Sequence, residues 1–160
     1  MNNTISNTDD VIDSRAIIER IEELEEELTE AHEQGEFMSD FDDWIENSRD
    51  NSDPIYAAFG EDEGRLIQTS IEELYALRQV AEECEGYGDW EHGEVLIKED
   101  YFTDYIEELI KDCHEMPKDM DSGRWPWNHM KLDYEAAAEE AKVDYMEVDF
   151  DGVTYYMRSC

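Results

Sequence analysis

A run of glutamates wound around an apolar stripe, from Glu19 to Glu36, limits what this chain can fold into more than any other feature. The stripe repeats at spacings of four, three, four and three, and it consists of Ile17, Ile21, Leu24, Leu28 and Ala31. This spacing predicts a helix that packs one face on another element. The other faces hold nine acidic residues over seventeen helical rises, or one negative charge per roughly 3 Å. Duplex DNA holds one per about 1.7 Å, so the two charge densities agree within a factor of two.

The whole chain shares this acidity. Its 160 residues include 46 acidic and 12 basic residues, which gives a formal net charge of −34. A magnitude of about 2 to 8 is enough to keep a small domain soluble, and the excess destabilises the fold by self-repulsion. Phosphates repel such a surface, so we expect no direct binding to nucleic acid and instead a basic DNA-binding protein as partner. Apolar residues at 40% and aromatics at 11% predict a folded core rather than a disordered acidic tail.

The apolar spacing predicts a mostly helical α+β fold. Five helices are expected: from between Asp9 and Ser14 to Gln34, 36–50, from Asp62 or Ser70 to Glu85, 100–113 and 134–143. Ser39 or Asp40, Asp100, and Asp133 are the expected N-caps of the second, fourth and fifth helices, and Ser70 with Glu73 matches a capping box. The segment 51–54 reads as a turn because it ends in Asp-Pro. It divides the chain into an acidic N-terminal helical segment, 1–50, and an α+β body, 51–160.

The C-terminus predicts a β-hairpin. Asp151-Gly152 is the sequence of a two-residue type I′ turn, and it places Phe150 opposite Val153 and Val148 opposite Tyr155. An isolated hairpin is only marginally stable. We therefore expect this one to pack on helices, and residues 94–98 are a candidate third strand.

No motif in the sequence indicates catalysis or metal binding. Cys84, Cys113 and Cys160 are far apart, and no histidine pair has the HExxH spacing. The acidic turn from Glu147 fails as a calcium loop because its twelfth position is Arg158. We expect a non-enzymatic protein without cofactor or metal. Three tryptophans beside glycine or proline either cover the core or anchor an interface: Trp90, Trp125 and Trp127.

Residues 86–158 carry a pattern found in small acidic proteins of phages and mobile elements. A short strand is followed by a Tyr-Phe-x-x-Tyr helix at 101–105, a Trp-Pro-x-Asn-His loop at 125–129, an alanine-rich helix and a closing hairpin. Part of this pattern resembles antirestriction proteins of the ArdA type, which mimic bent duplex DNA and occupy type I restriction enzymes. The N-terminal module of that family is not recognised here, and the helix of Glu19 to Glu36 stands in its place. The resemblance implies an acidic inhibitor and supplies no catalytic residue.

These observations predict a DNA mimic that occupies the DNA-binding groove of a host defence protein, either a restriction enzyme or a CRISPR effector. The phosphate-mimicking residues would be Glu19, Glu22, Glu23, Glu25, Glu26, Glu27, Glu30, Glu33, Asp40, Asp42, Asp43, Glu61, Asp62 and Glu63. One alternative is an adaptor that binds a partner helix through the apolar stripe, with the charge acting only in solvation. Another is general adaptation to high salt, in which the acidity serves the whole surface. The same stripe would suit a homodimer. The first ten residues lack the basic and apolar segments of a signal peptide, and no run is long enough to span a membrane, so the host cytosol is expected.

Overall fold

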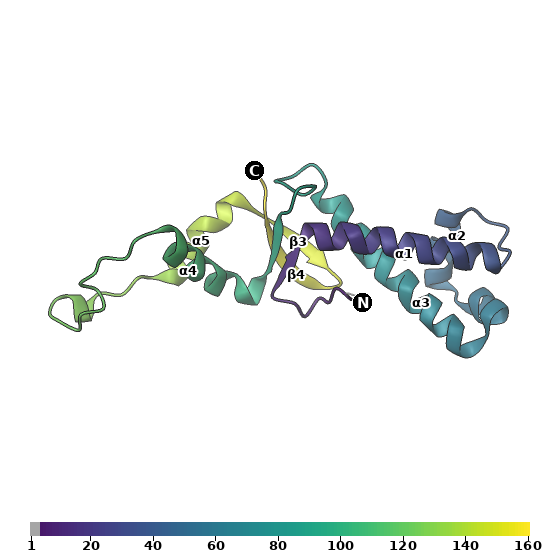
Figure 1. The fold of residues 1–160 in the computed structure, drawn as a ribbon, viewed down its shortest axis with the longest axis horizontal. Coiled ribbons are helices and arrows are strands. Elements are labelled where there is room, and N and C mark those ends of the chain that lie inside the picture. Colours follow the sequence, from purple (N-terminus) through teal and green to yellow (C-terminus); the bar gives the residue numbers. More distant parts are fainter. Residues whose placement is uncertain (1–3) are drawn as a thin grey trace.

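The computed structural model describes residues 4–160, and this part of the chain has the predicted α+β architecture, with five α-helices and a four-stranded antiparallel sheet. The molecule is elongated, with α1, α2 and α3 on one side of the sheet and α4 and α5 on the other (Figure 1). The helices are α1 (Ser14–Gln34), α2 (Phe41–Asp50), α3 (Asp53–Cys84), α4 (Phe102–Cys113) and α5 (Tyr134–Ala141). The strands are β1 (Val11–Asp13), β2 (Val95–Lys98), β3 (Tyr145–Phe150) and β4 (Val153–Arg158). No helix among residues 4–160 is both long and apolar enough to cross a bilayer.

Helix α1 forms where the apolar stripe predicted it, and it packs along α3. Its N-cap is Asp13, whose carboxylate accepts a hydrogen bond from the Arg15 amide at 2.9 Å. Ile17, Leu24 and Leu28 are fully buried, and burial of each such side chain stabilises the fold by about 1.5–3 kcal/mol. Most of the stripe is therefore filled from within the chain, and only Ile21 among its members stays partly exposed.

Helix α3 begins earlier than predicted. The expected starts at Asp62 and Ser70 are wrong, because the helix runs from Asp53 with Pro54 in its first turn, where a missing N–H costs nothing. Gly60 interrupts it with φ 81° and ψ −177°, a conformation open to glycine but strained for other residues. The capping box at Ser70 does not form, since Ser70 lies inside the helix and its hydroxyl donates to Glu27 of α1 at 3.4 Å.

Helix α2 closes the end of the α1–α3 pair with an aromatic cluster. Of the two predicted caps, Asp40 and not Ser39 caps this helix, by accepting a hydrogen bond from the Asp43 amide at 3.0 Å. The imidazole of His32 lies 5.2 Å from the Trp44 ring and 6.0 Å from the Phe37 ring, centroid to centroid. Its Nε2 is 2.8 Å from the Ser39 carbonyl oxygen. These contacts join the last turn of α1 to α2.

The sheet has the strand order β1-β2-β4-β3. The predicted hairpin register is confirmed, with Phe150 opposite Val153 and Val148 opposite Tyr155. The turn residues Asp151 and Gly152 have φ of 50° and 80°, as a type I′ turn requires. The candidate third strand at 94–98 pairs with β4 as β2. Strand β1 was not predicted, because three residues are too few to show an alternating pattern.

Helices cover both faces of this sheet, so the molecule has two cores. Tyr155 faces the core shared with α1 and α3, whereas its neighbour Tyr156 faces α4 and α5. Phe102 of α4 stacks against Tyr156 at 4.9 Å between ring centroids. The expected cap at Asp100 is wrong: residues 99–101 form a 3₁₀ turn, and α4 begins after it without a side-chain cap.

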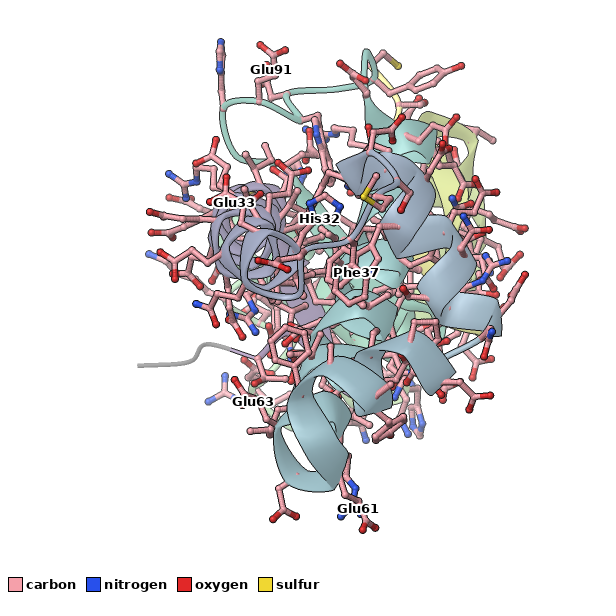
Figure 2. All side chains as sticks on the ribbon, turned by 90° about the vertical axis from the view of Figure 1, so that its right-hand side faces the viewer. His32, Glu33, Phe37, Glu61, Glu63 and Glu91 are labelled. Carbon is pink, nitrogen blue, oxygen red and sulfur yellow. The ribbon has the colours of Figure 1, made fainter. Side chains whose placement is uncertain are left out.

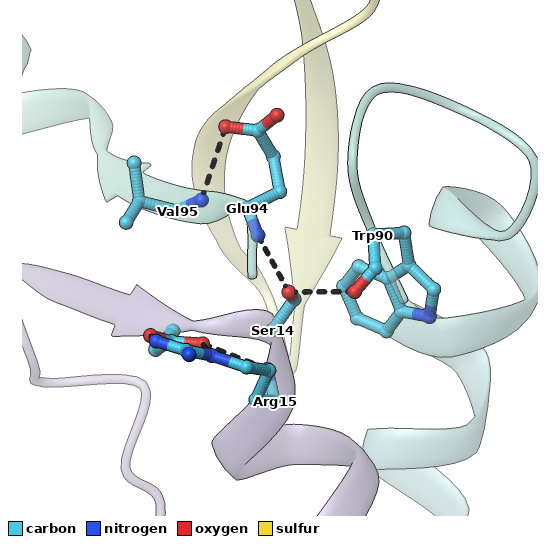
Figure 3. Close-up of polar contacts among 6 residues, drawn as sticks. Ser14, Arg15, Trp90, Glu94 and Val95 are labelled. Atoms are coloured by element: carbon cyan, nitrogen blue, oxygen red, sulfur yellow. Dashed lines mark hydrogen bonds and ion pairs between the residues drawn. The ribbon is translucent and has the colours of Figure 1, made fainter. Parts of the chain in front are cut away.

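Two buried polar contacts fix α1 against the rest of the chain. Ser14 is fully buried, and its hydroxyl donates to the Trp90 carbonyl at 2.7 Å and accepts from the Glu94 amide at 2.8 Å (Figure 3). Arg20 is also buried and makes a bidentate pair with Glu73 of α3 at 2.8 and 2.9 Å. Paired in this way, neither side chain carries the penalty of an unsatisfied buried polar group, and both fix the rotation of α1.

Candidate protein-binding surface

A ridge of carboxylates runs along α1, opposite its buried stripe. It consists of Glu19, Glu22, Glu26, Glu30 and Glu33, and we call it the glutamate ridge. Spacings of three and four residues keep these side chains on one face of a helix. All five are exposed, and none of them takes part in an ion pair within residues 4–160. The ridge is thus a continuous line of unneutralised negative charge.

The linear charge density of the ridge is within a factor of two of that of one DNA strand. From Glu19 to Glu33 the helix rises by about 21 Å, so the five ridge carboxylates are spaced by about 5 Å on average along the axis. One strand of B-DNA carries a phosphate every 3.4 Å. The comparison concerns spacing along the axis, which the helix keeps because it packs along α3.

The ridge is unfavourable for the helix that carries it. Glu22 and Glu26 are four residues apart, as are Glu26 and Glu30, and each such like-charge pair destabilises a helix by about 0.2–0.5 kcal/mol. Glu30 and Glu33 lie near the C-terminus of α1, where the helix dipole favours cations. The first turn, where acids would be stabilised, has none. The ridge glutamates therefore destabilise the helix that carries them, and neither packing nor helix stability explains their positions.

Neighbouring arginines do not neutralise the ridge, because each of them pairs elsewhere. Residues 1–97 contain five arginines and no lysine. Every one forms an ion pair away from the ridge: Arg15 with Asp13, Arg20 with Glu73 and Glu23, Arg49 with Asp50, Arg65 with Glu61, and Arg78 with Glu25 and Asp42. These arginines therefore either join two helices or pair with an acid close in sequence. None of them pairs with a carboxylate of the glutamate ridge.

The fourteen predicted phosphate-mimicking residues fall into two groups in the structure. Glu23, Glu25, Asp42 and Glu61 are in ion pairs, Asp40 caps α2, and Glu27 accepts a bond from Ser70. The free group contains the glutamate ridge together with Asp43, Asp62 and Glu63. An end-on view shows Glu33 on α1 and Glu61 and Glu63 on α3 pointing outward around the aromatic interior at Phe37 (Figure 2). The 61–63 cluster extends the acidic surface around the end of the bundle but does not belong to the ridge.

A second acidic feature was not predicted. A groove of about 1130 Å³ lies between residues 4–7, α3 and the hairpin turn, and its carboxylates include Glu72, Glu83, Asp149 and Asp151. Glu72 and Glu83 are eleven residues apart, which is three turns, so their shared helix face could have been read from the sequence. The contribution of the hairpin turn could not, because it depends on how β3 and β4 meet α3.

The three loop tryptophans differ in exposure. Trp90 is 5% exposed and belongs to the larger core, whereas Trp125 is 81% exposed. Trp127 is half-buried. In residues 4–160 no group of three or more histidine, cysteine or carboxylate side chains is arranged to hold a metal ion. A scan against protein-family models and searches of curated proteins and solved structures found no match to this chain. The resemblance to ArdA-type antirestriction proteins stays a prediction from the residues of the second half.

Proposed function

We propose that this protein is a DNA mimic, carried by a phage or mobile element, that occupies the DNA-binding groove of a host defence protein. The target would be a restriction enzyme or a CRISPR effector. The glutamate ridge of α1 would take the place of one phosphate strand, and lysine and arginine side chains of the target would pair with it instead of with DNA. Inhibition is then competitive and requires no catalytic step.

The observation that carries this proposal is the uncompensated ridge itself. Five exposed carboxylates share one helix face, and all five nearby arginines are committed to other acids. A surface helix that only needs solubility gains from alternating charges at i and i+4. This helix instead repeats glutamate at i and i+4, with a charge spacing within a factor of two of that of a DNA strand.

The mechanism predicts strongly salt-dependent association. Oppositely charged surfaces accelerate encounter, and that acceleration falls as ionic strength rises. A basic groove that binds DNA releases counterions from the DNA when it does so. The ridge competes for the same lysine and arginine side chains, so excess duplex DNA should displace the protein from its target.

The test compares two variants of equal net charge. Glu22→Gln, Glu26→Gln and Glu30→Gln neutralise three ridge positions, whereas Glu135→Gln, Glu140→Gln and Glu147→Gln neutralise three exposed acids elsewhere. Each triple variant and the wild-type chain is immobilised and exposed to host lysate at 0.05 and 0.5 M NaCl, with and without excess duplex DNA. Proteins retained at low salt and released by DNA are identified, purified and used for affinity measurements.

We expect the wild-type chain and the control variant to retain the same DNA-binding protein, and the ridge variant to lose it. If each removed pair contributes about 1 kcal/mol, the affinity falls on the order of 100-fold. Equal losses in the two variants would mean that bulk charge, and not the ridge, is responsible. Retention that duplex DNA does not reverse would refute mimicry.

A further inference from the structure

The loop between α4 and α5, residues 114–132, differs in character from the rest of the surface. It projects from the sheet on the side away from α1 and α3 (Figure 1), and we call it the arm. It holds three acidic and three basic residues, so it is electrically neutral on a chain of net charge −34. Three of its apolar side chains are open to solvent: Trp125 is 81% exposed, Met130 51% and Leu132 43%. Exposed tryptophan and methionine next to arginine is a composition typical of protein interfaces.

The cations of the arm are free. Lys118, Arg124 and Lys131 form no ion pair within residues 4–160, although the chain as a whole has almost four acids for every base. Arg124 is the direct neighbour of Trp125. The arm therefore presents an aromatic side chain accompanied by unpaired positive charge. Its complement is an apolar depression with an acidic rim, and the basic groove of a DNA-binding protein would repel it.

The other side of the molecule carries such a depression. A groove of about 440 Å³ lies between α1 and the last turns of α3, with Ile18, Ile21 and Ala81 in its lining beside Trp90. Arg78 is the one cation in this lining, and its charge is offset by ion pairs with Glu25 and Asp42. Four exposed carboxylates frame it, and they belong to Glu22, Glu82, Glu85 and Glu91. None of these four takes part in an ion pair among the residues that the structure describes. The groove matches the arm in both apolar character and charge.

We propose that two copies of this chain associate by placing the arm of each in the α1–α3 groove of the other, with Trp125 as the anchor. Within one copy the groove lies between α1 and α3, and the arm projects on the other side of the sheet from these helices (Figure 1), so the contact forms between copies. If each copy inserts its arm into the groove of the other, both arms and both grooves are occupied. The result is a closed dimer with two-fold symmetry. Arg124 and the two arm lysines then face the acidic rim, which offsets part of the repulsion between two strongly negative chains. This inference does not rest on the proposed function.

The test is sedimentation velocity and multi-angle light scattering of the full chain over a hundredfold range of concentration. Salt is set to 0.3 M, where the Debye length is on the order of 6 Å, so that repulsion between the copies is screened. We expect a concentration-dependent dimer, at least tenfold weaker in Trp125→Ala and in Arg124→Glu. Val143→Ala is the matched control, because Val143 is an apolar residue with 80% exposure outside the arm. It should leave association unchanged.

A mixing experiment identifies the groove. Trp125→Ala removes the anchor, and Ala81→Trp fills the groove with an indole of its own. Each variant alone should be monomeric where the wild type is dimeric, but a mixture retains one intact arm and one intact groove and should form heterodimers. Ile18→Glu replaces Ala81→Trp if the larger side chain lowers the melting temperature.

Each possible outcome decides the matter. A monomer at every concentration overturns the proposal, and so does a dimer that persists in Trp125→Ala, which would place the interface elsewhere. Dimer loss in both single variants without recovery in the mixture would refute the reciprocal arm–groove contact. A shift to the monomer in Trp125→Ala, with recovery on mixing, supports it.

Discussion

The two sides of the sheet differ in how much negative charge they carry and in how their basic residues are paired. Residues 1–97, which include α1, α2 and α3, contain 29 acidic residues and five arginines, a net charge of −24. Residues 98–160 contain 17 acidic and seven basic residues, a net charge of −10. All five arginines of the first part are ion-paired, whereas only Lys111 and Lys142 are paired among residues 98–160.

This difference shows that the surface charge is arranged and is not only a consequence of composition. In the first part, Arg20 and Arg78 pair with acids across helices, the other three arginines pair with nearby acids, and the acidic ridge faces outward without a cation. In the second part, free cations accompany exposed apolar side chains on the arm. One side of the molecule exposes a line of carboxylates, and the other exposes the indole of Trp125. The sheet between them contributes β4 to both cores and so couples the two sides.

The coupling is tested most severely by Phe102→Ala. Phe102 is 1% exposed and contacts Tyr156 of β4, so its truncation should cost about 3–5 kcal/mol. Because β4 also carries Tyr155 into the larger core, we expect one shared unfolding transition at lower urea, followed by circular dichroism and tryptophan fluorescence. Two separate transitions would show that the two sides fold independently. Val143→Ala should stay within about 0.5 kcal/mol of wild type.

Arg20→Met probes the internal use of cations in the helical part. It leaves Glu73, whose side chain is 17% exposed, without its bidentate partner, and should cost about 3 kcal/mol in urea unfolding. The double variant Arg20→Met with Glu73→Met should recover most of that loss, since a buried ion pair is not intrinsically more stable than an apolar pair of similar size. If the single variant is as stable as wild type, this arginine is not needed to hold α1 on α3.

Glu26→Lys tests whether the exposed charge of the ridge lowers the stability of α1. It turns the repulsive contacts with Glu22 and Glu30 into attractive ones, so thermal unfolding should show a gain of about 0.5–1 kcal/mol at low salt. The gain should shrink in 1 M NaCl, where the Debye length is about 3 Å. The same change should weaken binding to the proposed DNA-binding target. A variant that is less stable would contradict the view that the ridge opposes helix stability.

The smallest effect concerns the reactivity of the cysteines. Burial, helped by the neighbouring Glu83, raises the pKa of the Cys84 thiol to about 12, and only the thiolate reacts readily. At pH 8 a thiol-specific reagent should therefore modify the exposed Cys113 and Cys160 quickly and Cys84 only in denaturant. Rapid reaction of all three thiols in the native protein would mean that the helical part opens more easily than its packing indicates.

Local patterns were sufficient for much of the fold. The apolar stripe of α1, the caps at Asp40 and Asp133 and the type I′ turn at Asp151-Gly152 were predicted because each depends on residues close together in sequence. The start of α3 was missed because a proline that ends one helix is also favourable in the first turn of the next. Strand β1 was missed because only its pairing with β2 defines it.

The sequence by itself determined that this chain displays a dense line of negative charge on a helix with one packed face. Spacing and composition are local properties, and a helix preserves them. Only the tertiary structure decided which carboxylates remain free, since Glu25 and Asp42 meet Arg78 across helices and Arg20 meets Glu73. It also decided that the arm stands away from the acidic bundle and that an apolar groove with an acidic rim opens between α1 and α3. Those features depend on contacts between residues far apart in the chain, which no local pattern encodes.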